Sequence, residues 1–208
     1  MSGGAMDRRK DGPGLTLMSH EGTPYRFDPG ALCLELLPTG GPGVFARFEV
    51  LHTPADLVTW AGHSRLADGL DLTVDEDQLA RARALRNALF LLTADRAHGR
   101  PLRREHLDLI NAAAAEPPLV SRLGADGSRS WAPGATGTQL LSTVARDAID
   151  LFSGPYANRI RECGAHDCRL LFVDTSRPGR RRWCAMEHCG NRAKVRAHRA
   201  RRAPGEGA

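Results

Sequence analysis

The sequence predicts a mainly α-helical protein, with a helical N-terminal domain that contains a small β-hairpin and a short C-terminal domain organised by cysteines. Three observations carry this prediction. Apolar residues recur at helical spacing between about residues 53 and 152, an Asp126-Gly127 pair interrupts them with a hairpin signal, and four cysteines follow in two close pairs. The length of 208 residues suits one medium-sized domain and a small module, and 41% hydrophobic residues can form a core.

The N-terminal stretch, residues 1–24, is polar and Gly-rich at its start, so we expect it to be a disordered leader. Its charged residues are not followed by an apolar segment, which argues against a secretory signal peptide. The longest apolar run, from Ala88 to Ala94, is too short to span a bilayer. We therefore expect a cytoplasmic protein with no membrane partner.

The helical domain is expected to cover residues 25–155. Its first apolar block, residues 31–37, ends at Pro38 and fits either a short helix or a buried strand, with Cys33 as a small buried hydrophobe. Thr53 and Pro54 predict the start of a helix, and Thr73 with Glu76 has the spacing of a capping box for a second, long helix. The apolar positions of these two helices are Leu57, Trp60 and Ala61, and then Leu79, Ala82, Leu85, Ala88, Leu89 and Leu92. Arginines and aspartates on the helices are interpreted as a solvated face.

The second half of this domain continues in the same order. Residues 104–116 predict a further helix, with Leu107, Ile110 and Ala114 facing inward. Apolar and polar residues then alternate loosely around Asp126-Gly127, which predicts a small hairpin. Residues 138–153 return to helical spacing and end at Gly154 and Pro155.

Four cysteines near the C-terminus have the spacing of a metal site. Cys163 and Cys168 form one C-x4-C pair, Cys184 and Cys189 form another, and 15 residues separate the pairs. Two close pairs of thiolates suit a tetrahedral zinc ion, and four cysteines leave no open position for a catalytic metal. We therefore predict one structural Zn²⁺. Two disulfides, an iron–sulfur cluster, or replacement of a cysteine by His166 or His188 remain as alternatives.

The residues around the cysteines predict a treble-clef-like arrangement. Residues 169–174 are apolar enough for a strand, and an arginine-loaded turn follows at residues 175–182. Trp183 is expected to pack over the site, and Cys189 is expected in the first turn of a final helix. Zinc would then replace the hydrophobic core that so short a segment cannot build.

Positive charge is concentrated in the same C-terminal segment. Between Arg159 and Arg202 there are 13 Lys+Arg and 4 Asp+Glu, although the whole chain has 29 and 24. No acid occurs from Cys189 to Arg202, so ion pairs along that helix cannot neutralise it. This clustering indicates a polyanionic partner. The candidate nucleic-acid-binding residues are Arg177, Arg180, Arg181, Arg182, Arg192, Lys194, Arg196, His198, Arg199, Arg201 and Arg202.

The C-terminal sequence "FVDTSRPGRRRWCAMEHCGNRAKVRAHRARR" resembles the CGNR zinc finger family, in which Arg-Trp-Cys precedes Cys-Gly-Asn-Arg. The preceding domain resembles the ABATE domain in its "LCLELLPT", "TPADLVTWA" and "ALRNALFLL" segments, although Pro38 stands where that family usually has Asn. On this resemblance, residues 156–203 form the zinc finger and residues 204–208 a tail. The resemblance implies a bacterial stress-induced transcription regulator.

Function is therefore expected to be DNA binding and transcription regulation, with an N-terminal domain that senses a small-molecule effector or mediates assembly. A homodimer is left open. An RNA- or ribosome-associated zinc protein is the alternative, since arginine also binds RNA by shape. An enzyme in the N-terminal domain is a weaker alternative, and we predict no enzymatic activity, because the sequence holds no Gly-rich phosphate loop, G-x-S-x-G or H-E-x-x-H motif.

Overall fold

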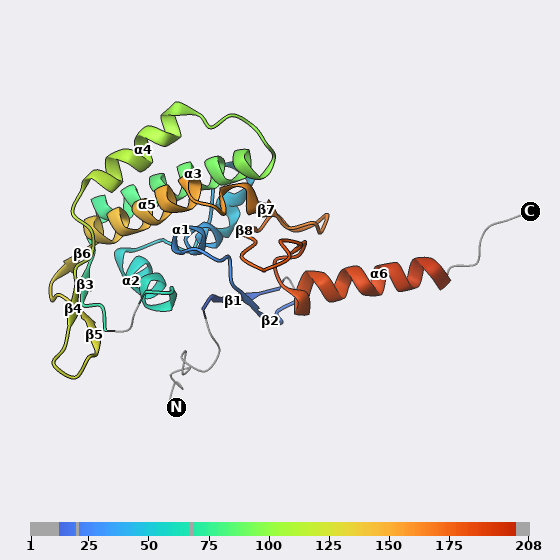
Figure 1. Ribbon diagram of the computed structural model, residues 1–208, viewed down its shortest axis with the longest axis horizontal. Helices are drawn as coiled ribbons and strands as arrows, with labels where there is room; N and C mark the ends of the chain where they lie inside the picture. The colour runs from blue at the N-terminus through green and yellow to red at the C-terminus, as the bar shows by residue number, and fades with distance from the viewer. Residues whose placement is uncertain (1–12, 20, 67–68, 203–208) are drawn as a thin grey trace, which may run out of the picture.

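The computed structural model describes residues 13–19, 21–66 and 69–202. Figure 1 shows a helical body with small strands at its periphery and one helix, α6, extending away from it. The α-helices are α1 (Leu32–Glu35), α2 (Pro54–His63), α3 (Glu76–Ala97), α4 (Arg104–Ala115), α5 (Gly137–Ser153) and α6 (Asn191–Arg202). Shorter turns are the 3₁₀ segments η2 (Leu37–Thr39), η3 (Gly43–Phe48) and η4 (Ala157–Arg159), and the π-helical turn η5 (Met186–Gly190).

The strands form two-stranded sheets rather than one continuous sheet. Three of these sheets are antiparallel: β1 (Leu15–Met18) with β2 (Pro24–Phe27), β4 (Ser121–Leu123) with β5 (Arg129–Trp131), and β7 (Ile160–Glu162) with β8 (Leu171–Val173). The remaining pair, β3 (Leu72–Thr73) with β6 (Ala135–Thr136), is parallel. The β4–β5 pair is the hairpin that the Asp126-Gly127 signal predicted. None of the described helices is long and apolar enough to cross a membrane.

The core of the helical domain lies between α3, α4 and α5, with α1 against α5 (Figure 1). Every apolar position predicted for α2 and α3 is buried, which confirms the helical spacing read from the sequence. The apolar block at residues 31–37 forms α1 and the start of η2, so the helical interpretation is confirmed. Its first turn is held by α5, because the Asp147 carboxylate accepts a hydrogen bond from the Cys33 amide at 2.8 Å.

The start of α3 differs from the prediction. Asp75, not Thr73, caps the helix, and Gln78 completes the capping box by accepting from the Asp75 amide at 3.1 Å. Thr73 is unavailable for capping because it lies in β3, paired with Thr136 of β6. The predicted cap at Thr53 is confirmed, with Asp56 as its partner.

One helical arginine contradicts the solvated face expected from the sequence. Arg86 is buried in α3, where its guanidinium donates to both carboxylate oxygens of Glu49 at 2.7 Å and to the Thr39 carbonyl at 3.3 Å. Gly40 makes room for it, since a Cβ at that position would lie 2.7 Å from Arg86 Nη1. A buried charge that is paired and hydrogen-bonded in this way can be tolerated in the core.

The N-terminal leader is corrected by the structure. Leu15–Met18 form β1, and β2 begins at Pro24, so the described part of residues 1–24 is a hairpin arm rather than a disordered segment. The first twelve residues and the expected tail at residues 204–208 lie outside the described residues. Alternating apolar residues at Leu15, Leu17 and Phe27 explain the hairpin, because they place one of its faces toward the protein.

The two halves of the chain are joined through β8. Its three residues are all buried, but they face different neighbours. Leu171 and Val173 pack into the core of the helical domain, whereas Phe172 packs with the cysteines. The alternation of side chains along a strand therefore lets one short strand serve two cores. Val173 is held further by its amide, which donates to the Pro29 carbonyl at 2.9 Å.

Candidate metal centre

The four cysteines predicted as ligands come together in one cluster. The sulfur atoms of Cys163, Cys168, Cys184 and Cys189 all lie within 4.8 Å of one another. The Sγ atoms of Cys184 and Cys189 are 3.5 Å apart, and those of Cys168 and Cys184 are 3.8 Å apart. A tetrahedral zinc with Zn–S bonds near 2.3 Å requires sulfurs about 3.8 Å apart, so the spacing fits one zinc ion. Cys33 is not part of the cluster, because it lies in the core of the helical domain.

Tight turns of the backbone aim these sulfurs at one point. Cys163 follows β7, and its amide donates to the Leu170 carbonyl at 2.9 Å, which closes the first knuckle. The amide of Cys184 donates to the sulfur of Cys163 at 3.4 Å, which links the second knuckle to the first. Cys189 lies in η5, directly before α6, so the final helix starts from a metal ligand as predicted.

The electrostatics of the cluster disfavour four thiolates in the absence of a cation. Burial raises the pKa of the Cys189 thiol, and hydrogen bonding to Cys163 raises that of Cys184. Hydrogen bonds from Cys168 and Cys184 lower the pKa of Cys163 to about 2, so a single thiolate is favoured within a group of thiols. Four adjacent thiolates repel one another unless a metal compensates their charge. Zinc, when bound, supplies that charge and holds the cysteines as four thiolates.

The two histidines in the knuckles have other partners. The imidazole of His188 stacks on Tyr25, with ring centroids 4.2 Å apart. His166 Nδ1 accepts a hydrogen bond from Arg196 Nη1 at 2.8 Å. The group of potential metal ligands found among the described residues is the four cysteines, so the structure favours them over either histidine.

The N-terminal hairpin completes the apolar shell around the cysteines. Phe27 is fully buried in the cluster with Phe172, and Leu17 and Tyr25 pack against it. The Glu187 carboxylate, two residues before Cys189, accepts from the Arg26 amide at 2.5 Å. Sequence reasoning missed this contribution. The alternation in "LTLM" and "PYRF" was the available signal for a hairpin, but no local pattern indicated where it would pack.

Arg181 braces the second knuckle instead of facing solvent. Its guanidinium lies 4.2 Å from the centre of the Phe172 ring, and its Nε donates to the Trp183 carbonyl at 3.0 Å. Its amide donates to the Asp174 carboxylate at 2.8 Å. Arg181, a candidate nucleic-acid contact in the sequence, is thus half-buried, and its guanidinium helps to orient the chain around Cys184. Trp183 packs against the cysteine cluster, as the sequence predicted.

The remaining basic residues divide into tethered and exposed groups. Arg192 forms an ion pair with Asp167 of the first knuckle, and Arg196 bonds to the neighbouring His166. Although α6 itself contains no acidic residue, it forms an ion pair with Asp167, which lies outside the helix. The exposed group comprises Arg177, Arg180, Arg182, Lys194, His198, Arg199 and Arg201. The side chain of Arg202 lies outside the described residues.

Together, the helical domain, the four clustered cysteines and the helix that follows Cys189 define a zinc-finger protein with a helical partner domain. The family models agree. Residues 30–155 match ABATE, described as "Putative stress-induced transcription regulator", and residues 159–202 match the CGNR zinc finger. The chain belongs to the ABATE family and carries a CGNR zinc finger whose four cysteines can bind one zinc ion. The comparison with curated proteins gives no match.

Proposed function

We propose that this protein is a transcription regulator whose zinc finger binds duplex DNA through α6. The observation that carries the proposal is the composition and position of that helix. From Asn191 to Arg202 it holds six Lys+Arg and no acid, and it extends away from the body of the protein (Figure 1). A rigid, metal-anchored helix of this kind presents its charge to a phosphate backbone. The helical domain, in this proposal, senses a ligand or mediates assembly.

The tethered residues decide which face of α6 is proposed to contact DNA. Arg192 and Arg196 are drawn toward Asp167 and His166 of the first knuckle. Lys194, His198 and Arg201 lie on the opposite face of the helix and are exposed. Neither Lys194 nor Arg201 forms an ion pair with any residue that the structure describes. We therefore assign the principal phosphate contacts to Lys194 and Arg201.

Duplex DNA is favoured over single strands by the aromatic residues near the finger. Binding of single strands relies on aromatic rings that stack on bases. Trp183 packs against the cysteine cluster and is covered by the Arg182 guanidinium, 5.1 Å from its ring centre. Tyr25 is stacked on His188. An α-helix, in contrast, fits the major groove of B-DNA.

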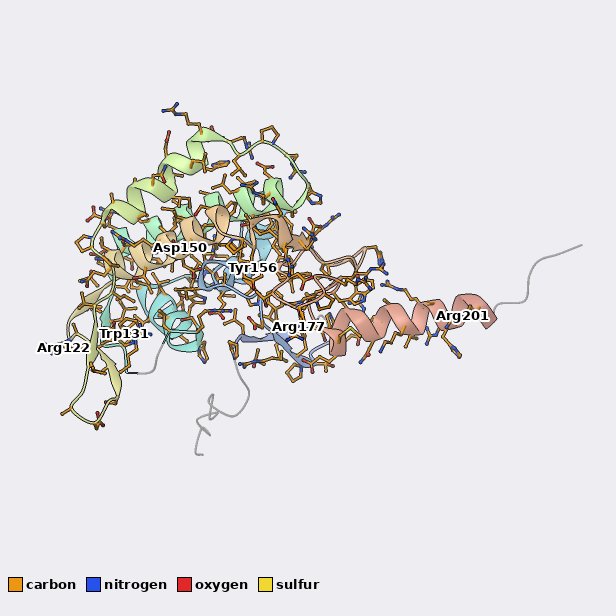
Figure 2. All side chains as sticks on the ribbon, viewed as in Figure 1. Arg122, Trp131, Asp150, Tyr156, Arg177 and Arg201 are labelled. Atoms are coloured by element: carbon orange, nitrogen blue, oxygen red, sulfur yellow. The ribbon has the colours of Figure 1, made fainter. Side chains whose placement is uncertain are left out.

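The salt dependence of DNA binding tests this proposal. The double variant Lys194→Ala/Arg201→Ala should bind duplex DNA more weakly, and the slope of log affinity against log salt should fall by about 2. A matched control removes two exposed arginines of the helical domain, Arg104→Ala/Arg122→Ala. Figure 2 shows Arg122 and Arg201 at opposite ends of the molecule. Equal slopes in the two double variants would overturn the assignment of α6.

A competition experiment separates DNA from RNA. The protein is first bound to a labelled pool of duplex DNA, and unlabelled duplex DNA or structured RNA is then added. We expect DNA to be the better competitor at equal nucleotide concentration. Preferential displacement by RNA would favour an RNA-associated zinc protein, because basic side chains also recognise the shape of RNA helices.

A further inference from the structure

A turn of residues 175–182, which we call the arginine turn, leads from β8 to the second knuckle. It contains no acidic residue, and its arginines at positions 177, 180 and 182 are exposed. The guanidinium of Arg182 lies over the Trp183 ring. The side chains of Arg177 and Arg180 form no hydrogen bond or ion pair with any residue that the structure describes. Their positive charge is therefore available to a partner.

A buried carboxylate fixes the backbone of the arginine turn. Asp174, which is 1% exposed, accepts hydrogen bonds from the Ser176 amide at 3.0 Å and the Ser176 hydroxyl at 2.6 Å. Its second oxygen accepts from the Arg181 amide at 2.8 Å. Burial would raise the pKa of Asp174, but the hydrogen bonds from Ser176 and the Arg181 amide, with the charge of Arg159, hold that pKa below its usual range. One ionised side chain thus holds both ends of the turn.

Further contacts hold the middle of the turn. Arg159 Nη1 donates to the Ser176 carbonyl at 2.9 Å, and the Gly179 amide donates to the same carbonyl at 3.1 Å. Gly179 has a φ of 61°, which favours glycine, and a Cβ at this position would lie 3.4 Å from Arg159 Cζ. None of these contacts uses the side chain of Arg177 or Arg180. The conformation of the turn is therefore set by the rest of the finger, and the two arginines are left to solvent.

The arginine turn and α6 are attached to the same knuckle. The guanidinium of Arg181, within the turn, donates to the carbonyls of Trp183 and Cys184. Cys189, the other cysteine of this knuckle, lies directly before α6. The exposed charge of the turn is thus continuous through the knuckle with the helix that is proposed to bind DNA. A preformed basic loop suits a phosphate backbone, because little conformational entropy is lost when it binds.

We propose that the arginine turn is a second DNA-contacting surface, in which Arg177 and Arg180 bind backbone phosphates that flank the segment bound by α6. Asp174 is a positioning residue for this contact. It does not touch DNA, but it holds the turn so that the two guanidinium groups meet the phosphates without further ordering of the chain. The inference rests on the proposed function, because it takes duplex DNA as the partner of α6.

The phosphate contacts are tested by the salt dependence of duplex DNA binding by the full-length, zinc-loaded protein. Arg177→Gln/Arg180→Gln should weaken binding about tenfold and lower the slope of log affinity against log salt by about 2. Arg104→Gln/Arg122→Gln removes the same charge from exposed positions of the helical domain, and Figure 2 shows Arg122 well apart from Arg177. This control should keep the wild-type slope. Equal slopes in the two double variants would overturn the turn as a DNA-contacting surface.

Simultaneous contact by the turn and α6 is tested by combining their variants. Adding Lys194→Ala/Arg201→Ala to Arg177→Gln/Arg180→Gln should lower the slope by about 4, since phosphate contacts of separate surfaces add. A slope no lower than that of Lys194→Ala/Arg201→Ala alone would refute the second surface and leave the proposed function standing. A wild-type protein that binds structured RNA but no duplex DNA would refute the proposed function, and loss of that RNA binding in Arg177→Gln/Arg180→Gln would assign the turn to RNA.

Two substitutions test the positioning role of Asp174. Asp174→Asn replaces one carboxylate oxygen by an amino group that cannot accept a hydrogen bond, and Ser176→Ala removes only the hydroxyl of an exposed residue. Each should lower the affinity for duplex DNA about threefold and retain one zinc per chain, because a loosened turn must be ordered on binding. Thr175→Ala is the matched control, since Thr175 is exposed and makes none of the hydrogen bonds that hold the turn. Affinities equal to that of Thr175→Ala would overturn the role.

A double-mutant cycle separates positioning from general stabilisation of the finger. In the Arg177→Gln/Arg180→Gln background, Ser176→Ala and Asp174→Asn should cause no further loss of DNA affinity, because the turn then has no guanidinium group to position. If Asp174→Asn does not retain zinc, the cycle with Ser176→Ala alone decides the question. An undiminished loss in this background would show that Asp174 supports the finger as a whole and would refute its positioning role.

Discussion

The helical domain and the zinc finger solve the same stability problem in different ways. The helical domain buries long apolar faces, chiefly those of α3 and α5, against one another. The finger buries far fewer apolar side chains and surrounds them with four cysteines, while its final helix remains largely exposed. A short segment cannot bury enough apolar area to offset the entropy of ordering its chain, so a metal supplies what the core lacks.

The finger and the helical domain also exchange apolar side chains. Phe27 arrives from the N-terminal hairpin, and Leu171 and Val173 insert into the helical core in return. Contacts between His98 and Glu162, 2.8 Å apart, add a polar link across the same boundary. The comparison therefore predicts that the two regions respond differently to loss of metal but are coupled through a few shared side chains.

Of the changes considered, loss of zinc should have the largest effect on folding, and this effect should be confined to the zinc finger. Removal by a chelator, or Cys184→Ser, should abolish hydrogen-exchange protection around residues 163–190, because zinc binding contributes about 10 kcal/mol or more to folding of such modules. Protection in α3 around residues 79–92 should persist. Cys33→Ala is the matched control, since it removes a cysteine of the helical core and should leave one zinc per chain. Retained protection of the finger after zinc removal would contradict a metal-dependent module.

Phe27→Ala should lower both the free energy of unfolding and the zinc affinity of the protein. Truncation of this fully buried ring is expected to cost about 3–5 kcal/mol in the free energy of unfolding and to lower zinc affinity. Leu89→Ala, within α3, should cost a similar amount without changing zinc affinity in the folded protein. Denaturant unfolding and a zinc competition assay measure the two quantities. Unchanged zinc affinity in Phe27→Ala would show that the hairpin is no part of the finger.

Glu49→Gln tests the buried ion pair of the helical domain. It should lower the free energy of unfolding by about 1.5–3 kcal/mol at neutral pH, because Arg86 loses a charged acceptor. Burial would raise the pKa of Glu49, but hydrogen bonds from Arg86 and the Leu51 amide outweigh it and hold the pKa below its usual range. This stabilisation is present above the unfolded pKa of about 4.3 and is lost as the pH falls through the lower folded pKa.

The acid side of the stability profile checks the sign of that effect. Wild-type stability should decline as the pH falls below about 4, and the decline should be shallower in Glu49→Gln. Asp77→Asn is a suitable control, because its ion pair with Arg81 at 2.6 Å is exposed. A profile for Glu49→Gln parallel to that of wild type would contradict the lowered pKa.

Asp167→Asn should give the smallest effect on stability, within about 1 kcal/mol, because its ion pair with Arg192 is partly exposed. Its effect on α6 should be clearer. Amide exchange in the first two turns of α6 should accelerate, since the tether between the first knuckle and the helix is lost. Unchanged exchange there would show that zinc ligation alone orients the helix.

The sequence by itself determined the local features of this protein. Helical spacing identified the buried faces of α2 and α3, the Asp126-Gly127 pair identified the β4–β5 hairpin, and the spacing of the cysteines identified the metal ligands. These predictions succeed because periodicity, turn chemistry and ligand spacing act over a few residues and do not depend on the rest of the chain.

Tertiary structure alone decided the features that join distant segments. It placed β1 and β2 on the cysteines, buried Arg86 against Glu49, turned Arg181 inward over Phe172, and tied Arg192 to Asp167. The sequence pattern around an arginine does not indicate whether its side chain faces solvent or pairs with a carboxylate. Its role depends on which partner the fold brings within hydrogen-bonding distance, and on how far that partner's surroundings exclude water.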